Sequence, residues 1–212
     1  MNADLAETTI LPKILHGTPH RLLERIDLEI IFRGAAGWWL FYAFLLFTGL
    51  RSDIVAMLVY GNIDRKKRAL VNFMYSSRYN FEYPLVDVLL DPILDDQNAS
   101  APLFPRLFSN IEHPILRQQQ LNENLALPNE FMQALLGAED RPLATLHSFR
   151  LTFNETLRNL GRRLGDRQVM GIYSRGKGTR FSTHPSFDLA VNYLTELSDV
   201  FKPVGPFNYR PS

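Results

Sequence analysis

Cysteine is absent from this 212-residue chain. Its absence excludes disulfide bonds, zinc sites built on cysteine and thiol nucleophiles. The first residues also lack the basic stretch followed by an apolar run that marks a secretory signal. We therefore expect a cytoplasmic protein that stays in the compartment where it is made.

Motifs for catalysis and cofactor binding are missing as well. The chain has no nucleophile elbow, no phosphate-binding P-loop and no glycine-rich dinucleotide turn. Its five histidines are scattered, and Gly17 and Pro19 break the helix that His16 and His20 would need to bind a metal together. We expect no enzyme activity, no cofactor, no metal and no small-molecule substrate. The enzymatic alternative is a nuclease whose metal-binding carboxylates meet only in the fold.

Long apolar runs are also scarce, and the main one covers residues 34–50. Its length is at the lower limit for a membrane span, and it contains three glycines. A helix that is apolar on all sides is otherwise buried in a core or in a subunit interface. We expect a buried helix and no membrane partner. The alternative is a structural or interaction protein that associates with a membrane through residues 34–50.

Net charge is low, +1 over the chain, but it is unevenly distributed. Residues 147–180 contain eight Lys or Arg and two Asp or Glu, a net charge of +6, whereas the remaining residues sum to −5. A local concentration of positive charge is the usual electrostatic signature of phosphate binding. The basic stretch therefore indicates a nucleic-acid partner.

Residues 148–153 alternate between polar and apolar side chains. Phe149 and Phe153 are large and apolar, whereas Ser148, Arg150 and Thr152 form hydrogen bonds. Alternation with a period of two is typical of a half-buried strand. The polar face of such a strand suits base edges and phosphates, and a pair of strands fits the major groove. The alternative is an ordinary edge strand whose arginines are only solvated.

The residues after this strand resemble two helices. Leucines at spacings of three and four occupy residues 157–164, and Gly165 and Asp166 supply a stop and a new helix cap. A second interpretation keeps the basic residues exposed but changes the geometry. Residues 169–174 and 179–184 would then form a hairpin with its turn at residues 175–178.

The run HSFRLTF, NETLRNLGRRLG, DRQVMGIYSR resembles the ribbon-helix-helix family of DNA-binding regulators. The resemblance implies an obligate homodimer whose paired strands enter the major groove, with Ser148, Arg150 and Thr152 at the outward positions. More generally, the chain resembles the AcaB-like regulators associated with conjugation of plasmids and integrative elements. This likeness implies a role in transcription regulation.

A second basic cluster, RKKR, occupies residues 65–68, directly after Asp64. Asp64 can cap a helix over the following residues, which would place four cations in its first turn. Cations there oppose the helix dipole unless an anion lies nearby. The cluster is therefore either a second phosphate contact or a solvated start of a surface helix.

The remaining patterns are mostly helical. Residues 115–125 and 128–136 predict two helices, and residues 186–201 predict a final amphipathic helix. The expected fold is mainly α with a small β component. Residues 1–140 form a mainly helical core region, residues 141–180 the basic strand-helix-helix module, and residues 181–212 a C-terminal helix with an irregular tail.

These patterns together predict a sequence-specific DNA-binding transcriptional regulator that acts as a dimer on double-stranded DNA. The residues expected to contact DNA are Ser148, Arg150, Thr152, Arg158, Arg162, Arg163, Arg167, Arg175, Lys177, Arg180, Arg65, Lys66, Lys67 and Arg68.

Overall fold

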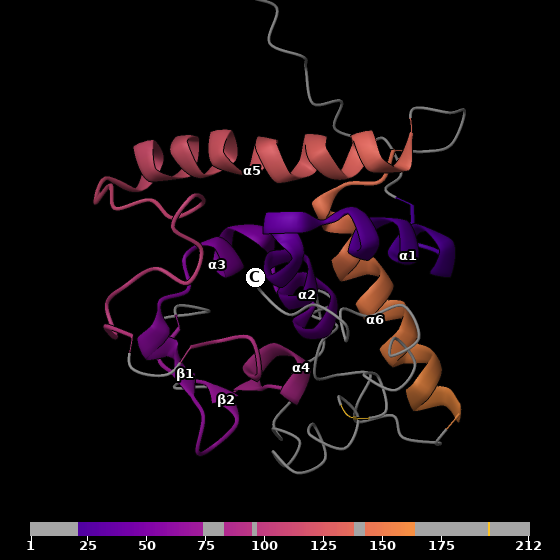
Figure 1. Ribbon diagram of the computed structural model, residues 1–212, viewed down its shortest axis with the longest axis horizontal. Helices are drawn as coiled ribbons and strands as arrows, with labels where there is room; N and C mark the ends of the chain where they lie inside the picture. Colours follow the sequence, from indigo (N-terminus) through magenta and orange to yellow (C-terminus); the bar gives the residue numbers. More distant parts are fainter. Residues whose placement is uncertain (1–20, 74–82, 95–96, 138–142, 164–194, 196–212) are drawn as a thin grey trace, which may run out of the picture.

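The computed structural model describes residues 21–73, 83–94, 97–137 and 143–163, together with residue 195. The chain is mainly helical and carries a small antiparallel sheet (Figure 1). This agrees with the fold class predicted from the sequence. The main helices are α1 (Arg25–Gly34), α2 (Trp39–Thr48), α3 (Ser52–Ala56), α4 (Asp87–Leu90), α5 (Pro114–Leu136) and α6 (Leu146–Arg163). Two short 3-10 helices occupy Ala36–Trp38 and Tyr60–Asn62.

Helix α2 is the centre of the core. All of its residues are apolar except Thr48, and all but Leu40 are buried. A helix that is apolar all round requires neighbours on every side, and α1, α3, α4 and α6 contribute to the surrounding cluster. The prediction of a buried helix within residues 34–50 is therefore confirmed. Within the described ranges, no helix is both long and apolar enough to cross a membrane.

Helix α2 ends at Gly49, whose backbone has a left-handed φ of 60° and whose N–H donates to the Leu45 carbonyl oxygen. Glycine adopts this conformation without the steric cost of a Cβ atom. A Cβ atom at this position would also lie 2.1 Å from Cδ1 of Phe153 in α6. The turn after α2 therefore depends on glycine for both its backbone angle and its packing.

Helix α1 is anchored at its start by a buried ion pair. Asp27 is 3% exposed and accepts hydrogen bonds from the Arg21 guanidinium and from the Glu24 backbone N–H at 2.8 Å. The hydrogen bonds from Arg21 to Asp27, together with the charge of this carboxylate, raise the pKa of the Arg21 guanidinium. Asp27 thus stabilises the first turn of α1 and fixes the chain that leads into it.

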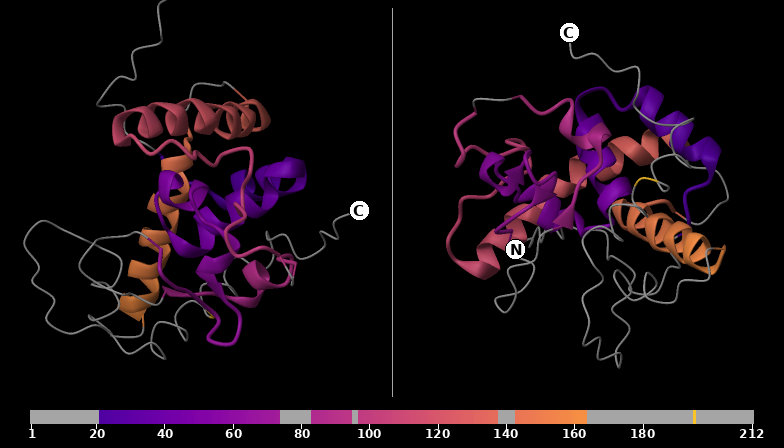
Figure 2. Two further views of the ribbon diagram at one scale, coloured as in Figure 1. Left: turned by 90° about the vertical axis from the view of Figure 1, so that its left-hand side faces the viewer. Right: turned by 90° about the horizontal axis from the view of Figure 1, so that it is seen from below.

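Helix α5 lies across one end of the other helices, and α6 leads away from beneath it (Figure 2). The two helices predicted for residues 115–136 are one continuous helix, which contains Pro128. Proline removes one backbone hydrogen bond from a helix interior. Here the Tyr42 hydroxyl, whose pKa is raised by burial, donates to the Pro128 carbonyl oxygen at 2.6 Å. This contact ties the proline turn of α5 to the core helix α2.

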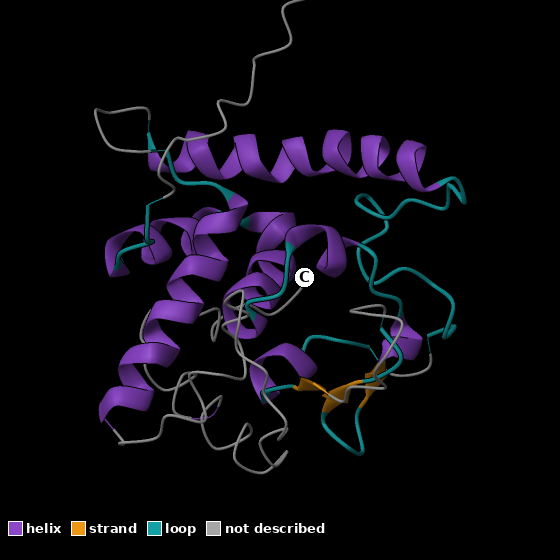
Figure 3. Cartoon of the chain, turned by 180° about the vertical axis from the view of Figure 1, so that it is seen from behind, coloured by secondary structure: helices purple, strands orange, loops and turns teal. Residues whose placement is uncertain are grey.

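The sheet lies at the opposite end from α5 (Figure 3). It consists of β1 (Ile63–Asp64), β2 (Ala69–Leu70) and β3 (Tyr83–Pro84), paired antiparallel in that order. Asp64 pairs with Ala69, so residues 65–68 form the turn of a hairpin.

The prediction of a helix after Asp64 is therefore wrong. The Asp64 side chain accepts the Lys67 N–H at 2.9 Å, and Arg68 has a left-handed φ of 53°. A carboxylate that binds the N–H three residues later occurs both at helix starts and in tight turns. The sequence pattern at Asp64 is the same in the two cases.

Helix α6 replaces the strand predicted for residues 148–153. Its apolar residues Leu146, Phe149 and Phe153 are buried at spacings of three and four. Phe149 stacks on Tyr42 of α2, with ring centroids 5.4 Å apart and an angle of 14° between the ring planes. A spacing of four satisfies both a period of two and a helical period. Phe149 and Phe153 therefore fit either structure.

The polar residues between them are the ones that distinguish helix from strand. Ser148 is fully buried, and its Oγ accepts the Thr145 N–H at 3.0 Å, which caps the start of α6. Thr152 is 6% exposed, and its Oγ1 accepts the Leu23 N–H at 2.8 Å. Both hydroxyls stabilise the fold instead of facing solvent.

Replacement of Thr152 by valine should lower the free energy of unfolding by about 1–3 kcal/mol, because the buried Leu23 N–H loses its acceptor. The matched control is Thr156→Val in the same helix. The Thr156 hydroxyl donates to the Thr152 carbonyl oxygen at 2.8 Å, so its removal takes no acceptor from a backbone N–H of the described residues. We expect a smaller loss for the control in urea denaturation. Equal stability of Thr152→Val and the unmodified protein would contradict the buried position of Thr152.

Candidate functional site

The structure separates the three residues predicted to read DNA bases. Ser148 and Thr152 are buried, so they cannot contact bases in this conformation. Arg150 is half-buried, and its guanidinium donates to the Gly49 carbonyl oxygen at the end of α2. The paired-strand ribbon is thus overturned by α6. The homodimer was expected because one strand supplies half of a ribbon, and this reason for it no longer applies.

The basic turn at residues 65–68 is partly used within the fold. The Arg65 guanidinium donates to the carbonyl oxygens of Leu90 and Ile93 near the end of α4. Arg68 forms an ion pair with Asp87 at 2.5 Å. All four cations, including Lys66 and Lys67, are nevertheless exposed. We interpret Arg65 and Arg68 primarily as residues that hold the hairpin against α4.

The other predicted DNA contacts follow the buried part of α6. Arg158, Arg162 and Arg163 belong to the second half of this helix. Positions 158 and 162 are one helical turn apart and share a face. The remaining predicted contacts, Arg167, Arg175, Lys177 and Arg180, lie outside the described residues. The alternative hairpin at residues 169–184 also lies outside them, and of the predicted helix 186–201 only Thr195 is described, as helical.

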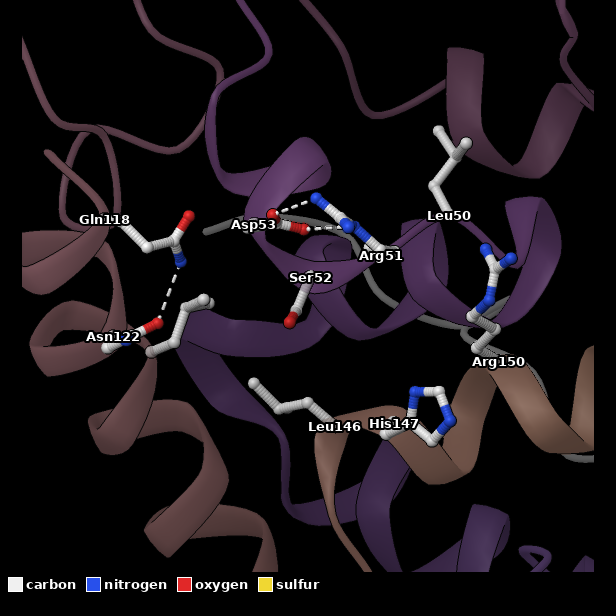
Figure 4. Close-up of a pocket in the computed structure, with 10 residues that line it drawn as sticks. Leu50, Arg51, Ser52, Asp53, Gln118, Asn122, Leu146, His147 and Arg150 are labelled. Atoms are coloured by element: carbon white, nitrogen blue, oxygen red, sulfur yellow. Dashed lines mark hydrogen bonds and ion pairs between the residues drawn. The ribbon is translucent and has the colours of Figure 1, made fainter. Parts of the chain in front are cut away.

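Three helices in the described part of the chain line a polar pocket that the sequence did not predict. It has a volume of about 270 Å³ and lies between the start of α3, one side of α5 and the first turns of α6 (Figure 4). Its apolar part is formed by buried leucines, and its polar part by charged and amide side chains. The lining residues are Leu50, Arg51, Ser52, Asp53, Gln118, Asn122, Leu125, Leu146, His147 and Arg150.

Two pairs of polar side chains on the pocket wall bind each other. Arg51 donates to Asp53 from Nε at 3.0 Å, and its terminal nitrogen lies 2.5 Å from the second carboxylate oxygen. On α5, the Gln118 amide donates to the Asn122 side-chain oxygen at 2.9 Å. Figure 4 shows the Ser52 hydroxyl directed from α3 towards the side of the pocket formed by Leu146 and His147. The pocket thus brings together groups from three separate helices.

Sequence reasoning missed this pocket for a simple reason. Its residues come from three segments about 70 and 30 residues apart, and no local motif joins them. Only Arg150 belonged to a predicted site, and it was assigned to base contacts. Among the residues that the structure describes, no group of three or more His, Asp or Glu is arranged to hold a metal ion.

Comparisons with protein-family models, with curated proteins and with solved structures gave no match to this chain. The class that the structure itself defines is a mainly helical protein with a small antiparallel sheet.

Proposed function

We propose that this protein binds double-stranded DNA through the basic segment that begins in the second half of α6. The observation that carries the proposal is the net charge of +6 in residues 147–180, against −5 in the rest of the chain. Neutralisation of phosphates by Lys and Arg supplies most of the affinity of nonspecific DNA binding. A chain of nearly zero net charge that gathers its cations in one segment favours an anionic polymer as partner.

The arrangement of α6 supports the proposal. Its first half is fixed to α2 through Phe149 and Phe153, both fully buried. Its second half carries Arg158, Arg162 and Arg163 and no carboxylate after Glu155. The second half continues the same helix, so the backbone ties these three positions to the anchored first half. The basic segment therefore has one end attached firmly to the core.

The proposed contacts are to phosphates. Ser148 and Thr152 are used inside the fold, so they do not read bases. Phosphate contacts set orientation and affinity, whereas sequence preference requires contacts to base edges or to DNA shape. Any sequence preference, and with it a role in transcription regulation, then depends on residues beyond Arg163.

The test is a mobility shift on a 30-base-pair duplex with the triple variant Arg158→Ala, Arg162→Ala, Arg163→Ala. We expect affinity at least roughly tenfold weaker than that of the unmodified protein, because three phosphate contacts are lost. The charge-matched control replaces Arg25, Arg33 and Arg106, which are exposed on α1 and on the loop before α5. Circular dichroism checks that the helix survives, since cations near a helix C-terminus also stabilise it. Equal weakening by both triple variants would contradict a site on α6.

A further inference from the structure

We propose that the pocket between α3, α5 and α6 binds a small organic anion that carries one carboxylate or phosphate group beside a short apolar group. This inference goes beyond DNA binding and is independent of it, because every pocket residue precedes the second half of α6, where the segment proposed for DNA begins. It rests on the charge, the hydrogen-bond donors and the shape of the pocket.

The charge of the pocket favours an anion. Asp53 is the only carboxylate among the lining residues, and it is held by Arg51 through two contacts. Arg150 also lines the pocket, and within the described ranges no carboxylate pairs with it. Its one hydrogen bond to a described residue is to the Gly49 carbonyl oxygen, which leaves further N–H donors of a guanidinium that has five. One positive charge in the pocket is thus uncompensated by the lining side chains.

The hydrogen-bond donors match the same ligand. The Ser52 hydroxyl has no hydrogen-bond partner in the described part of the chain. The Asn122 side chain accepts from Gln118, so its NH₂ group remains available as a donor. Figure 4 shows Ser52 between Asn122 on one side of the pocket and Arg150 on the other, so three helices place donors around it. Hydrogen bonds to an ionised carboxylate or phosphate are stronger than those between neutral groups.

The apolar residues limit what accompanies the charged group. Leu50, Leu125 and Leu146 are each less than one-tenth exposed and form the apolar part of the pocket. A volume of about 270 Å³ lies just below the roughly 300–1,000 Å³ of pockets for drug-sized ligands, so the pocket suits a small molecule of about ten non-hydrogen atoms.

The experiment is isothermal titration calorimetry of the full chain with isovalerate, with isobutyl phosphate and with the neutral analogue isovaleramide, at low ionic strength. We expect at least one anion to bind and the amide not to bind, because the amide keeps the apolar group and lacks the charge. Whichever anion binds more tightly identifies the charged group that the pocket prefers. Ser52→Ala and Arg150→Gln should each weaken that binding about tenfold, since each removes a donor to an anion.

Two matched variants control for general effects. Ser100→Ala and Arg106→Gln change the same residue types at exposed positions of the loop between α4 and α5, outside the pocket lining, and should leave binding unchanged. Ser52→Ala removes no hydrogen bond between described residues, so its result is informative even if Arg150→Gln is destabilised. The proposal is overturned if neither anion binds, or if Ser52→Ala and Arg150→Gln titrate like the two controls. Ser52→Ala should retain full DNA affinity, which separates a failure here from a failure of the DNA proposal.

Discussion

Replacement of Gly49 by alanine is expected to cost about 2–5 kcal/mol of stability. A left-handed backbone costs a residue with a Cβ atom about 1–2 kcal/mol. The new methyl group would also lie 2.1 Å from the Phe153 ring, and inserting a group into a packed core costs about 1–3 kcal/mol more. The loss is measured as the change in the urea denaturation midpoint.

Two other glycines separate these causes. Gly137 has open space around its Cβ position but φ 75° and ψ 156°, a conformation essentially confined to glycine, so Gly137→Ala should show a backbone cost without a clash, and a larger backbone cost than at Gly49. Gly37 has open space and no left-handed φ, so Gly37→Ala should change stability by less than about 0.5 kcal/mol. If Gly49→Ala costs less than about 2 kcal/mol, the left-handed backbone accounts for the whole loss and Phe153 does not pack on the end of α2. A partial recovery in the double variant Gly49→Ala, Phe153→Leu would support that contact directly.

Truncation of Phe149 to alanine should strongly destabilise the protein. The side chain is fully buried, and its ring stacks on Tyr42, which also holds the Pro128 turn of α5. Removal of a buried phenylalanine costs about 3–5 kcal/mol, through lost burial and the cavity left behind.

The control for Phe149→Ala is Leu143→Ala, a truncation shortly before the same helix. Leu143 is 58% exposed, so its loss should lower the free energy of unfolding by less than about 1 kcal/mol. Chemical denaturation monitored by circular dichroism measures both variants. A loss below about 1 kcal/mol for Phe149→Ala would mean that α6 does not pack on α2 through this face.

The core helix could be predicted from the sequence because its cause is local. A helix formed from an uninterrupted apolar run must be covered on all sides in a folded protein, and α2 is covered in this way. The helical structure of residues 115–136 was predicted correctly, but Pro128 was interpreted as a break between two helices. The buried face of α5, which includes Leu125, Pro128 and Met132, packs on distant segments, and so does the contact from Tyr42, so neither was visible in the local sequence.

The errors at α6 and at residues 65–68 have a common origin. In both, one local pattern fits two structures: apolar residues four apart fit a helix or a strand, and Asp64 fits a helix cap or a turn. The choice is made by tertiary contacts, namely the Leu23 N–H on Thr152 and the pairing of Asp64 with Ala69. The pocket could not be predicted at all, because Ser52, Asn122 and Arg150 meet only in the folded chain.

Binding of DNA phosphates by the basic segment that starts in α6 is the central claim. Fluorescence anisotropy of a labelled duplex, titrated with the protein at about 50 and 200 mM salt, tests it most directly. The three arginines of α6, each on one phosphate, alone predict an affinity that falls about fortyfold between these conditions, and the triple arginine variant should lower the slope of log affinity against log salt concentration by about 2.7. Absence of binding at the lower salt concentration, or an affinity that salt leaves unchanged, would contradict the claim.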